Sequence, residues 1–348
     1  MARLLTPLYL AELGRRNRRF DRGAGVTRFD VPVISVGNIS VGGVGKTPMV
    51  MTIAGWLLES GRRPCIAMRG YKAGAGESDE AALYRERFGD VPVVAQPDRT
   101  AGLRALFAQE RVGQASSLPG PGARIDCIIL DDGFQHRQIA RDLDIVLIDA
   151  THDPFADRPL PAGWLREPVS ALARAGAIVI THAEAVEPKT IDELRARIAD
   201  ITGAPIAVTR HTWQRLRVAE ADGAERIERR AWLVGRRIVA ACAIGNPEAF
   251  LRAAGEAVGA SGEVTGSLVL RDHDPFSEKT VGRLIALARQ HTAEAIVLTA
   301  KDWAKLAKVD RLRWPAPVVV AELGTEFVSG DRDLQTLVRA CVDRSAAR

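Results

Sequence analysis

Short, continuously apolar segments alternate with stretches of helical periodicity through the first half of the chain. The segments expected to be strands are 31–36, 64–68, 91–95, 125–130, 145–148 and 177–181. Apolar runs without alternation are typical of parallel strands that helices cover on both faces. The pattern therefore predicts an α/β fold with a doubly wound, mostly parallel sheet and right-handed crossovers. Ligands of such folds bind at the carboxyl ends of the strands.

A polar, charged stretch divides the chain. It covers residues 212–237, and we interpret it as an inter-domain linker. The strands expected after it are 238–244, 263–270, 295–299 and 318–321. With 348 residues the chain is long enough for two domains. We expect a larger domain over 26–211 and a second, smaller α/β domain over 238–348.

A glycine-rich turn joins the first strand to a helix expected over 48–59. Glycines let the backbone turn its N–H groups toward phosphate oxygens, and the helix start adds unpaired donors. The expected nucleotide-binding residues are Gly42, Gly43, Val44, Gly45, Lys46, Thr47 and Pro48. Lys46 supplies positive charge and Thr47 a hydroxyl for Mg²⁺. Ser40 stands where the strict motif has its first glycine, and a tight turn closing a βα unit is the alternative.

Two adjacent aspartates, Asp131 and Asp132, follow the apolar run 125–130. A carboxylate at a strand end across from the loop threonine is the usual Mg²⁺ partner of a phosphate loop. We expect both aspartates to be catalytic and favour Asp131, with Thr47, as the metal ligand. The sequence leaves Asp132 open as the ligand, and an aspartate that caps a turn is the alternative for either.

The composition excludes few classes of function. The net charge of +5 fits an anionic substrate, an anionic membrane surface or nucleic acid. Basic residues are dispersed and aromatic content is 5%, which argues against nucleic acid. The four cysteines are scattered, so we expect reduced thiols without a disulfide framework or a zinc site. No apolar run approaches the ~20 residues of a membrane span, and no cleavable signal peptide is recognisable.

The N-terminal segment, residues 1–25, combines apolar and basic side chains. The apolar set is Leu4, Leu5, Leu8, Tyr9, Leu10 and Leu13, and arginines flank it at 3, 15, 16, 18, 19 and 22. This pattern favours an amphipathic helix in the membrane interface with arginines at lipid headgroups. A helix docked on its own domain is the alternative.

Five sequence blocks occur in order: 37–48, 69–71, 131–136, 160–168 and 299–302. Through them the chain resembles the tetraacyldisaccharide 4'-kinase family, the lipid A 4'-kinases of Gram-negative bacteria. The resemblance implies a P-loop NTPase-type fold whose smaller C-terminal domain closes over the site. It implies transfer of the γ-phosphate of ATP to the 4'-hydroxyl of tetraacyldisaccharide 1-phosphate, an acylated glucosamine disaccharide 1-phosphate, giving lipid IVA in lipid A biosynthesis.

The same resemblance implies ATP and Mg²⁺ as cofactors. It also implies a peripheral protein, on an anionic membrane surface at the cytoplasmic face of the bacterial inner membrane. We expect a monomer with no nucleic-acid partner.

Two further catalytic residues come from the resemblance. Asp79 matches the family's base, with Ser78 in place of a glycine, and His273 matches its histidine partner, with Arg271 in place of a proline. A carboxylate that orients an imidazole raises its basicity. The alternatives are a solvated acid at a helix start and a histidine in a surface turn.

The residues expected at the substrate are Arg69, Tyr71, His136, Arg166 and Glu167. Arginines at strand ends bind phosphate in a bidentate manner. Structural ion pairing of Arg69 and Arg166 with Glu167 or Asp79 is the competing interpretation. His136 could orient a metal-bound carboxylate or simply cap its loop.

A ParA-like regulatory ATPase that acts through protein partners is the alternative function. Its phosphate loop resembles residues 42–47. That group, however, has a lysine where this chain has Val41, and it lacks the block 131–136.

Overall fold

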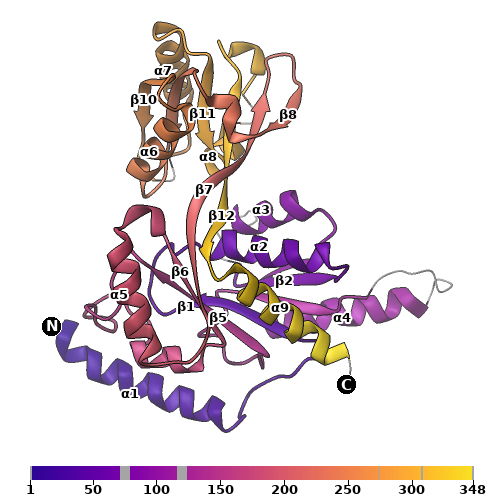
Figure 1. Ribbon diagram of the computed structural model, residues 1–348. Helices are drawn as coiled ribbons and strands as arrows, with labels where there is room; N and C mark the ends of the chain where they lie inside the picture. Colours follow the sequence, from indigo (N-terminus) through magenta and orange to yellow (C-terminus); the bar gives the residue numbers. More distant parts are fainter. Residues whose placement is uncertain (1, 71–78, 116–123, 273, 307–308, 347–348) are drawn as a thin grey trace. The chain divides into compact units, whose positions relative to one another are not determined.

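The computed structural model describes residues 2–70, 79–115, 124–272, 274–306 and 309–346. The chain forms two compact units, Met1–His211 with Thr325–Arg348 and Thr212–Gly324 (Figure 1). Two long strands, β7 (Ile206–Ala219) and β12 (Val318–Ser329), each contribute residues to both units. The polypeptide therefore leaves the first unit once and returns to it once.

In the sheet of the first unit, the strands lie in the order β7–β6–β5–β1–β4–β2–β3, and neighbours in this order are parallel. Its remaining strands are β1 (Val33–Asn38), β2 (Pro64–Met68), β3 (Val93–Ala95), β4 (Cys127–Asp131), β5 (Leu143–Asp149) and β6 (Ala177–Thr181). β1, β2, β4 and β6 are buried along their whole length, as expected for strands covered on both faces. The doubly wound fold predicted from the apolar runs is confirmed.

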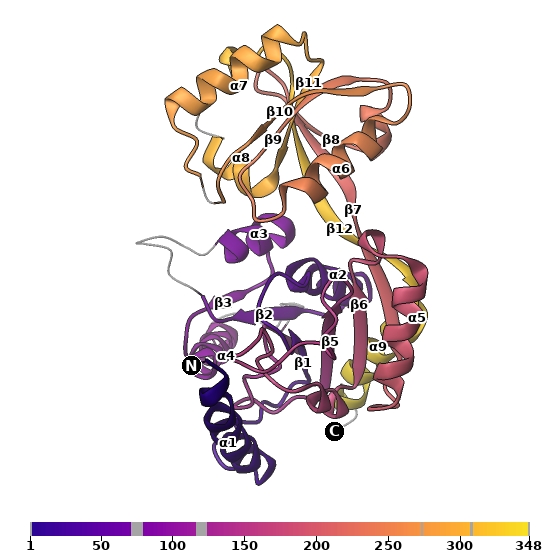
Figure 2. The ribbon, with the colours of Figure 1, turned by 90° about the vertical axis from the view of Figure 1, so that its left-hand side faces the viewer.

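Helices cover both faces of this sheet. The first unit contains helices α1 (Ala2–Asp21), α2 (Lys46–Glu59), α3 (Asp79–Phe88), α4 (Arg99–Ala115), α5 (Pro188–Ala199) and α9 (Asp331–Ala346), with short 3₁₀ turns η1 (Val169–Arg174) and η2 (Ala183–Ala185). One core packs α2 and α9 against β1, and another packs α5 against β5 and β6 (Figure 2). Leu103 of α4 lies in a third core with β2 and β4.

Helix α9 corrects the predicted domain boundary at the C-terminus. We expected residues 238–348 to form the second domain, but α9 belongs to the first unit. Leu334, Val338 and Val342 recur every four residues and are buried in the core that contains Ile53 and Leu57 of α2. The sequence shows this apolar stripe but not the helix against which it packs.

The second unit is also an α/β structure. Its parallel strands, β9 (Arg237–Cys242), β10 (Glu263–Val269) and β11 (Ala295–Thr299), lie in the order β10–β9–β11–β12. Its helices are α6 (Pro247–Val258), α7 (Glu278–Gln290) and α8 (Ala300–Leu306), with 3₁₀ turns η3 (Arg230–Leu233) and η4 (Arg311–Arg313). Helices α7 and α6 pack into two separate apolar cores.

The expected linker over 212–237 is wrong. This segment contains the second half of β7, the antiparallel strand β8 (Glu225–Glu228) and η3. Leu216 and Val218 are fully buried, and Arg215 and Arg217 alternate with them and pair with Glu322. Alternation of charged and apolar positions marks a strand with one solvated face, which the high charge content concealed.

Candidate active site

The glycine-rich turn connects β1 to α2 as the sequence predicts. Gly45 precedes the helix in the left-handed region (φ 82°), and α2 begins at Lys46. A Cβ on Gly45 would lie 2.6 Å from Nε2 of His211, so both the backbone angle and the space require glycine. The start of α2 therefore presents unpaired N–H groups and a positive dipole end to the loop, which suits an anion.

Lys46 is held at the edge of the sheet by two acceptors. Its Nζ lies 3.4 Å from Oδ1 of Asp132 and donates to Oδ1 of Asn38 at 3.3 Å. The side chain retains 15% exposure, so the ammonium is shielded but not sealed off. A cation in this position can exchange a carboxylate partner for a phosphate oxygen.

Asp131 is a buried carboxylate with one oxygen in use. The Tyr84 hydroxyl donates to Oδ2 at 2.9 Å and also hydrogen-bonds Thr47. Oδ1 is buried and has no hydrogen-bond partner among the described residues. Burial raises the pKa of Asp131 to about 6, although Tyr84 and Lys46 oppose the rise. Asp131 therefore has one unpaired buried carboxylate oxygen, and its other oxygen is linked to Thr47 through the Tyr84 hydroxyl. A carboxylate oxygen of this kind fits a hard cation such as Mg²⁺.

Asp132 has the opposite environment. Arg166 Nη1 donates to both of its oxygens, at 3.0 and 2.9 Å, and Lys46 lies on its other side. Burial raises the pKa of Asp132, but Lys46 and then Arg166 outweigh it and hold the pKa below its usual range. Arg99 donates to the Asp132 carbonyl at 3.1 Å. The two adjacent aspartates are therefore distinguished by their partners, one ion-paired and one with a free oxygen.

Arg166 and Glu167 do not pair with each other. Arg166 binds Asp132, a partner that the sequence did not predict. The Glu167 side chain is 1% exposed, lies 3.0 Å from Arg174 and accepts from Gln135 at 3.1 Å. Through these contacts the buried Glu167 connects the segments that carry Arg174 and Gln135. Direct contact of Glu167 with substrate stays a prediction.

His136 and Arg69 lie near this edge. Burial, reinforced by the positive charges of Arg99 and Arg141, lowers the pKa of His136 to about 4, so the ring is neutral at physiological pH. Its Nε2 is buried without a hydrogen-bond partner in the described part of the chain. Arg69 follows β2, is exposed and contributes to the same lowering of the His136 pKa.

The proposed proton-transfer pair cannot be placed. Tyr71, Ser78 and His273 lie outside the described residues, and Asp79 is described only as the first residue of α3. Pairing of Asp79 with His273 therefore stays a prediction.

The block at 299–302 forms a helix start in the second unit. Thr299 accepts the Asp302 N–H and donates to Asp302 Oδ2, while Asp302 also accepts the Ala243 N–H. Thr299 caps α8, and Asp302 joins that helix to the end of β9.

Several residues of the site were missed. Asn38 and Gln135 lie inside the recognised blocks, and Gln135 Nε2 donates to the Asn38 carbonyl at 2.8 Å. A polar side chain inside an otherwise apolar strand end could have drawn attention to Asn38. Tyr84 and Arg99 lie on helices without a local motif, so only the folded chain brings them to the aspartates.

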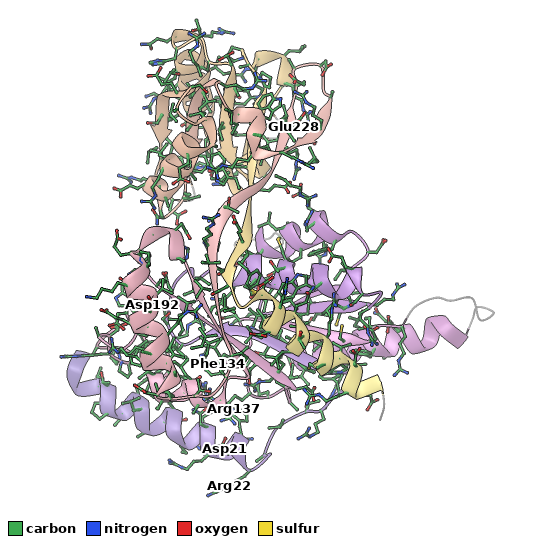
Figure 3. The ribbon with its side chains drawn as sticks, in the orientation of Figure 1. Asp21, Arg22, Phe134, Arg137, Asp192 and Glu228 are labelled. Carbon is green, nitrogen blue, oxygen red and sulfur yellow. The ribbon has the colours of Figure 1, made fainter. Side chains whose placement is uncertain are left out.

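Helix α1 docks beside the same loops. The Tyr9 hydroxyl donates to the Arg166 carbonyl at 2.6 Å, and Arg137 pairs with Asp21 at 2.6 Å near the helix end (Figure 3). Leu13 is buried, whereas Leu5 and Leu8 are 53% and 74% exposed. The docked alternative therefore holds for part of the helix, and an apolar surface remains. Among the described residues, no helix is long and apolar enough to cross a membrane.

The chain is similar to known proteins over most of its length. The family model described as tetraacyldisaccharide-1-P 4'-kinase matches residues 1–342. A tetraacyldisaccharide 4'-kinase from Anaeromyxobacter dehalogenans (strain 2CP-C) is 38% identical over 88% of this chain and 84% of its own length. One from Anaeromyxobacter sp. (strain K) is 37% identical over 97% and 90%.

Among solved structures, LpxK from Aquifex aeolicus in complex with ATP superposes with a TM-score of 0.70. The two sequences are 28% identical, and the match covers 97% of both chains. The P-loop-type fold and the resemblance seen in the five sequence blocks are both confirmed. The chain belongs to the tetraacyldisaccharide-1-P 4'-kinase family.

Proposed function

We propose that this protein transfers the γ-phosphate of ATP to the 4'-hydroxyl of tetraacyldisaccharide 1-phosphate and so forms lipid IVA. The observation that carries the proposal is the phosphate loop beside the Asp131–Asp132 pair, in a chain that the family model matches over residues 1–342. The ATP complex of the Aquifex structure supports ATP as the donor. A ParA-like switch is not favoured, because the relatives with high coverage are named as kinases.

Phosphoryl transfer depends mainly on positioning and charge neutralisation. The α2 start and Lys46 bind the outer phosphates. Thr47 and Asp131 would hold Mg²⁺, which when bound neutralises charge on the phosphate oxygens. Asp132 holds Lys46 and Arg166 together through its two ion pairs. The two cations are thereby fixed before the nucleotide arrives, which lowers the cost of ordering them.

The acceptor hydroxyl must lose a proton. Asp79 is the base in this proposal, and His273 is its partner. A positioned base contributes about 10²–10⁴-fold to such a step. Arg69, Tyr71 and His136 are the proposed contacts of the anionic lipid substrate, while Glu167 holds the loop from which Arg166 projects.

The lipid substrate calls for contact with a membrane, and α1 is the proposed contact. Leu5 and Leu8 are exposed on it, and Trp164, two residues before the Arg166 that Tyr9 binds, is 63% exposed. Exposed apolar side chains beside arginines suit an anionic lipid interface. We place the protein, as a monomer, on the cytoplasmic face of the inner membrane.

The test is transfer of radiolabelled γ-phosphate from ATP to tetraacyldisaccharide 1-phosphate in detergent micelles with Mg²⁺. The expected result is a labelled lipid and ATP consumption that requires the lipid. ATP hydrolysis that does not depend on the lipid and is stimulated by a protein partner would support the regulatory ATPase instead.

A further inference from the structure

A second group of potential metal ligands lies beside the phosphate loop. His182, Glu184 and His211 each direct one ligand atom into a space in which all three atoms lie within 4.8 Å of one another. His182 and Glu184 follow the end of β6, and His211 lies on the neighbouring strand β7. All three belong to the first unit. The cluster shares no residue with the proposed Mg²⁺ site.

The spacing inside the cluster suits a tetrahedral ion. The two Nδ1 atoms of His182 and His211 lie 3.0 Å apart, and His182 Nδ1 lies 3.4 Å from Oε1 of Glu184. Ligand atoms bound to zinc at about 2.0–2.1 Å are roughly 3.3 Å apart in a tetrahedron. Nδ1 of His182 lies close to this separation from both of the other ligand atoms, and all three atoms lie within 4.8 Å of one another. The two imidazoles and the carboxylate therefore need little movement to bind one cation.

The ligands are also oriented by their surroundings. Glu184 Oε2 accepts the backbone N–H of His211 at 3.0 Å, which leaves Oε1 for the cluster. His182 Nε2 faces Asp149 Oδ2 at 3.9 Å, so its ring has a carboxylate on the side away from the cluster. A carboxylate behind a histidine is the usual way in which proteins orient a metal-binding ring.

The backbone of His182 is unusual. It lies in the left-handed region (φ 60°), where a residue with a side chain is disfavoured. Such conformations persist where the surrounding structure enforces them and are common at binding sites. The strained backbone is an observation independent of the side-chain cluster.

The cluster adjoins the phosphate loop. The His182 ring hydrogen-bonds the backbone of Gly43, and His211 Nε2 lies where a side chain on Gly45 would be. A cation held here would add positive charge next to the loop amides. Three protein ligands also leave one tetrahedral position for water or an anionic oxygen.

We propose that His182, Glu184 and His211 form a binding site for a divalent transition-metal ion, of the Zn²⁺ or Co²⁺ type. Imidazole nitrogens favour such ions, whereas Mg²⁺ and Ca²⁺ prefer oxygen ligands. The site is distinct from the one at Thr47 and Asp131, and it does not depend on which substrate the enzyme phosphorylates.

The test uses the full-length chain after chelator treatment, without nucleotide. Zn²⁺ binding is measured by calorimetry and Co²⁺ binding by its visible absorption, for wild type, His211→Gln, Glu184→Gln and the control His291→Gln in the second unit. The expected result is one tightly bound ion per wild-type and control chain and a loss of about 100-fold or more in affinity for His211→Gln. Weak, multiple binding by wild type, or equal binding by His211→Gln, would overturn the proposal.

A second measurement needs no variant and so is independent of folding defects. X-ray absorption of the zinc-loaded wild type should show two imidazoles and oxygen in the first coordination shell. Sulfur in that shell would place the ion on one of the four cysteines, all of which are buried, and would contradict the assignment.

Discussion

Two buried aspartates, one in each unit, both lie at or just after the carboxyl end of a strand, and they differ in the groups that bind them. Asp131 ends β4 in the first unit, and Asp302 follows β11 in the second. Each has an Oδ1 atom without a hydrogen-bond partner in the described part of the chain. Asp302 Oδ2, however, accepts a backbone N–H and the Thr299 hydroxyl, and Lys305 lies 3.8 Å from Oδ1.

Asp131 accepts no backbone donor among the described residues and is bound by the Tyr84 hydroxyl. Asp302 therefore joins a helix to a strand and has Lys305 beside its second oxygen, whereas one oxygen of Asp131 has no hydrogen-bond partner among the described residues, which suits the metal-ligand role that we propose for it. Burial of a carboxylate at a strand end does not by itself indicate function, and its partners decide between the two roles. Each aspartate also has a lysine nearby, Lys46 in the first unit and Lys305 in the second. We expect Lys46 to act in catalysis and Lys305 to have only a structural role.

The largest expected effect comes from the lysine of the first unit. Lys46→Ala removes a cation from the phosphate loop and should lower kcat/KM by about 10²–10³ or more, because the lost charge acts on the reacting phosphate. Lys305→Ala is the matched control and should leave kcat/KM within about 3-fold. Steady-state phosphorylation of the lipid measures both. Similar losses of kcat/KM in the two variants would contradict the different roles assigned to Lys46 and Lys305.

Asp302→Ala should affect stability rather than chemistry. It orphans the Ala243 N–H, and an unsatisfied buried donor costs about 1–3 kcal/mol. Thermal unfolding of the purified variant should therefore show a lower midpoint, with lipid phosphorylation retained below that temperature. An unchanged midpoint together with lost activity would move Asp302 into the active site.

Leu8, which is more exposed than Leu5 on the same helix α1, has a counterpart in the second unit. Leu8 is 74% exposed and Leu312 is 78% exposed. Leu8→Asp should weaken binding to anionic vesicles by about 10-fold or more. A leucine side chain that becomes buried in the membrane contributes about 1.5–3 kcal/mol to the free energy of binding. Leu312→Asp should leave it unchanged. Vesicle sedimentation distinguishes them, and equal sedimentation would argue against α1 as the membrane contact.

The smallest effect concerns the pH dependence of stability without Mg²⁺. Because burial raises the folded-state pKa of Asp131 to about 6, the folded protein takes up a proton before the unfolded chain does. Its contribution to stability is present at low pH and is lost as pH rises through about 6. Chemical denaturation between pH 4 and 7 should show wild type losing stability relative to Asp131→Asn. A constant difference across this range would contradict the raised pKa.

The sequence predicted features that local pattern encodes. The strands β2, β6 and β11 begin and end where their apolar runs do, and the phosphate loop lies between strand and helix as expected. Features that depend on distant packing were missed. The charged face of β7 obscured a strand, and the apolar stripe of α9 does not reveal that it packs on α2.

The site shows the same division. Lys46, Asp131 and Asp132 could be proposed from the sequence because they lie in motifs. Tyr84 comes from a helix about fifty positions before the aspartate that it binds, and no local signal connects the two. The ion pair between Arg166 and Asp132 likewise depends on the folded chain, because either aspartate could serve equally well on sequence alone.

The most direct test of the central contrast is Mg²⁺-dependent transfer of labelled phosphate to tetraacyldisaccharide 1-phosphate by Asp131→Asn and Asp302→Asn, each compared with wild type. We predict that Asp131→Asn remains folded but loses at least about 10²-fold in rate and its response to Mg²⁺, because the proposed metal ligand is neutralised. Folded Asp302→Asn should keep both. Undiminished, Mg²⁺-dependent transfer by Asp131→Asn would contradict the assignment of Asp131 as the metal ligand.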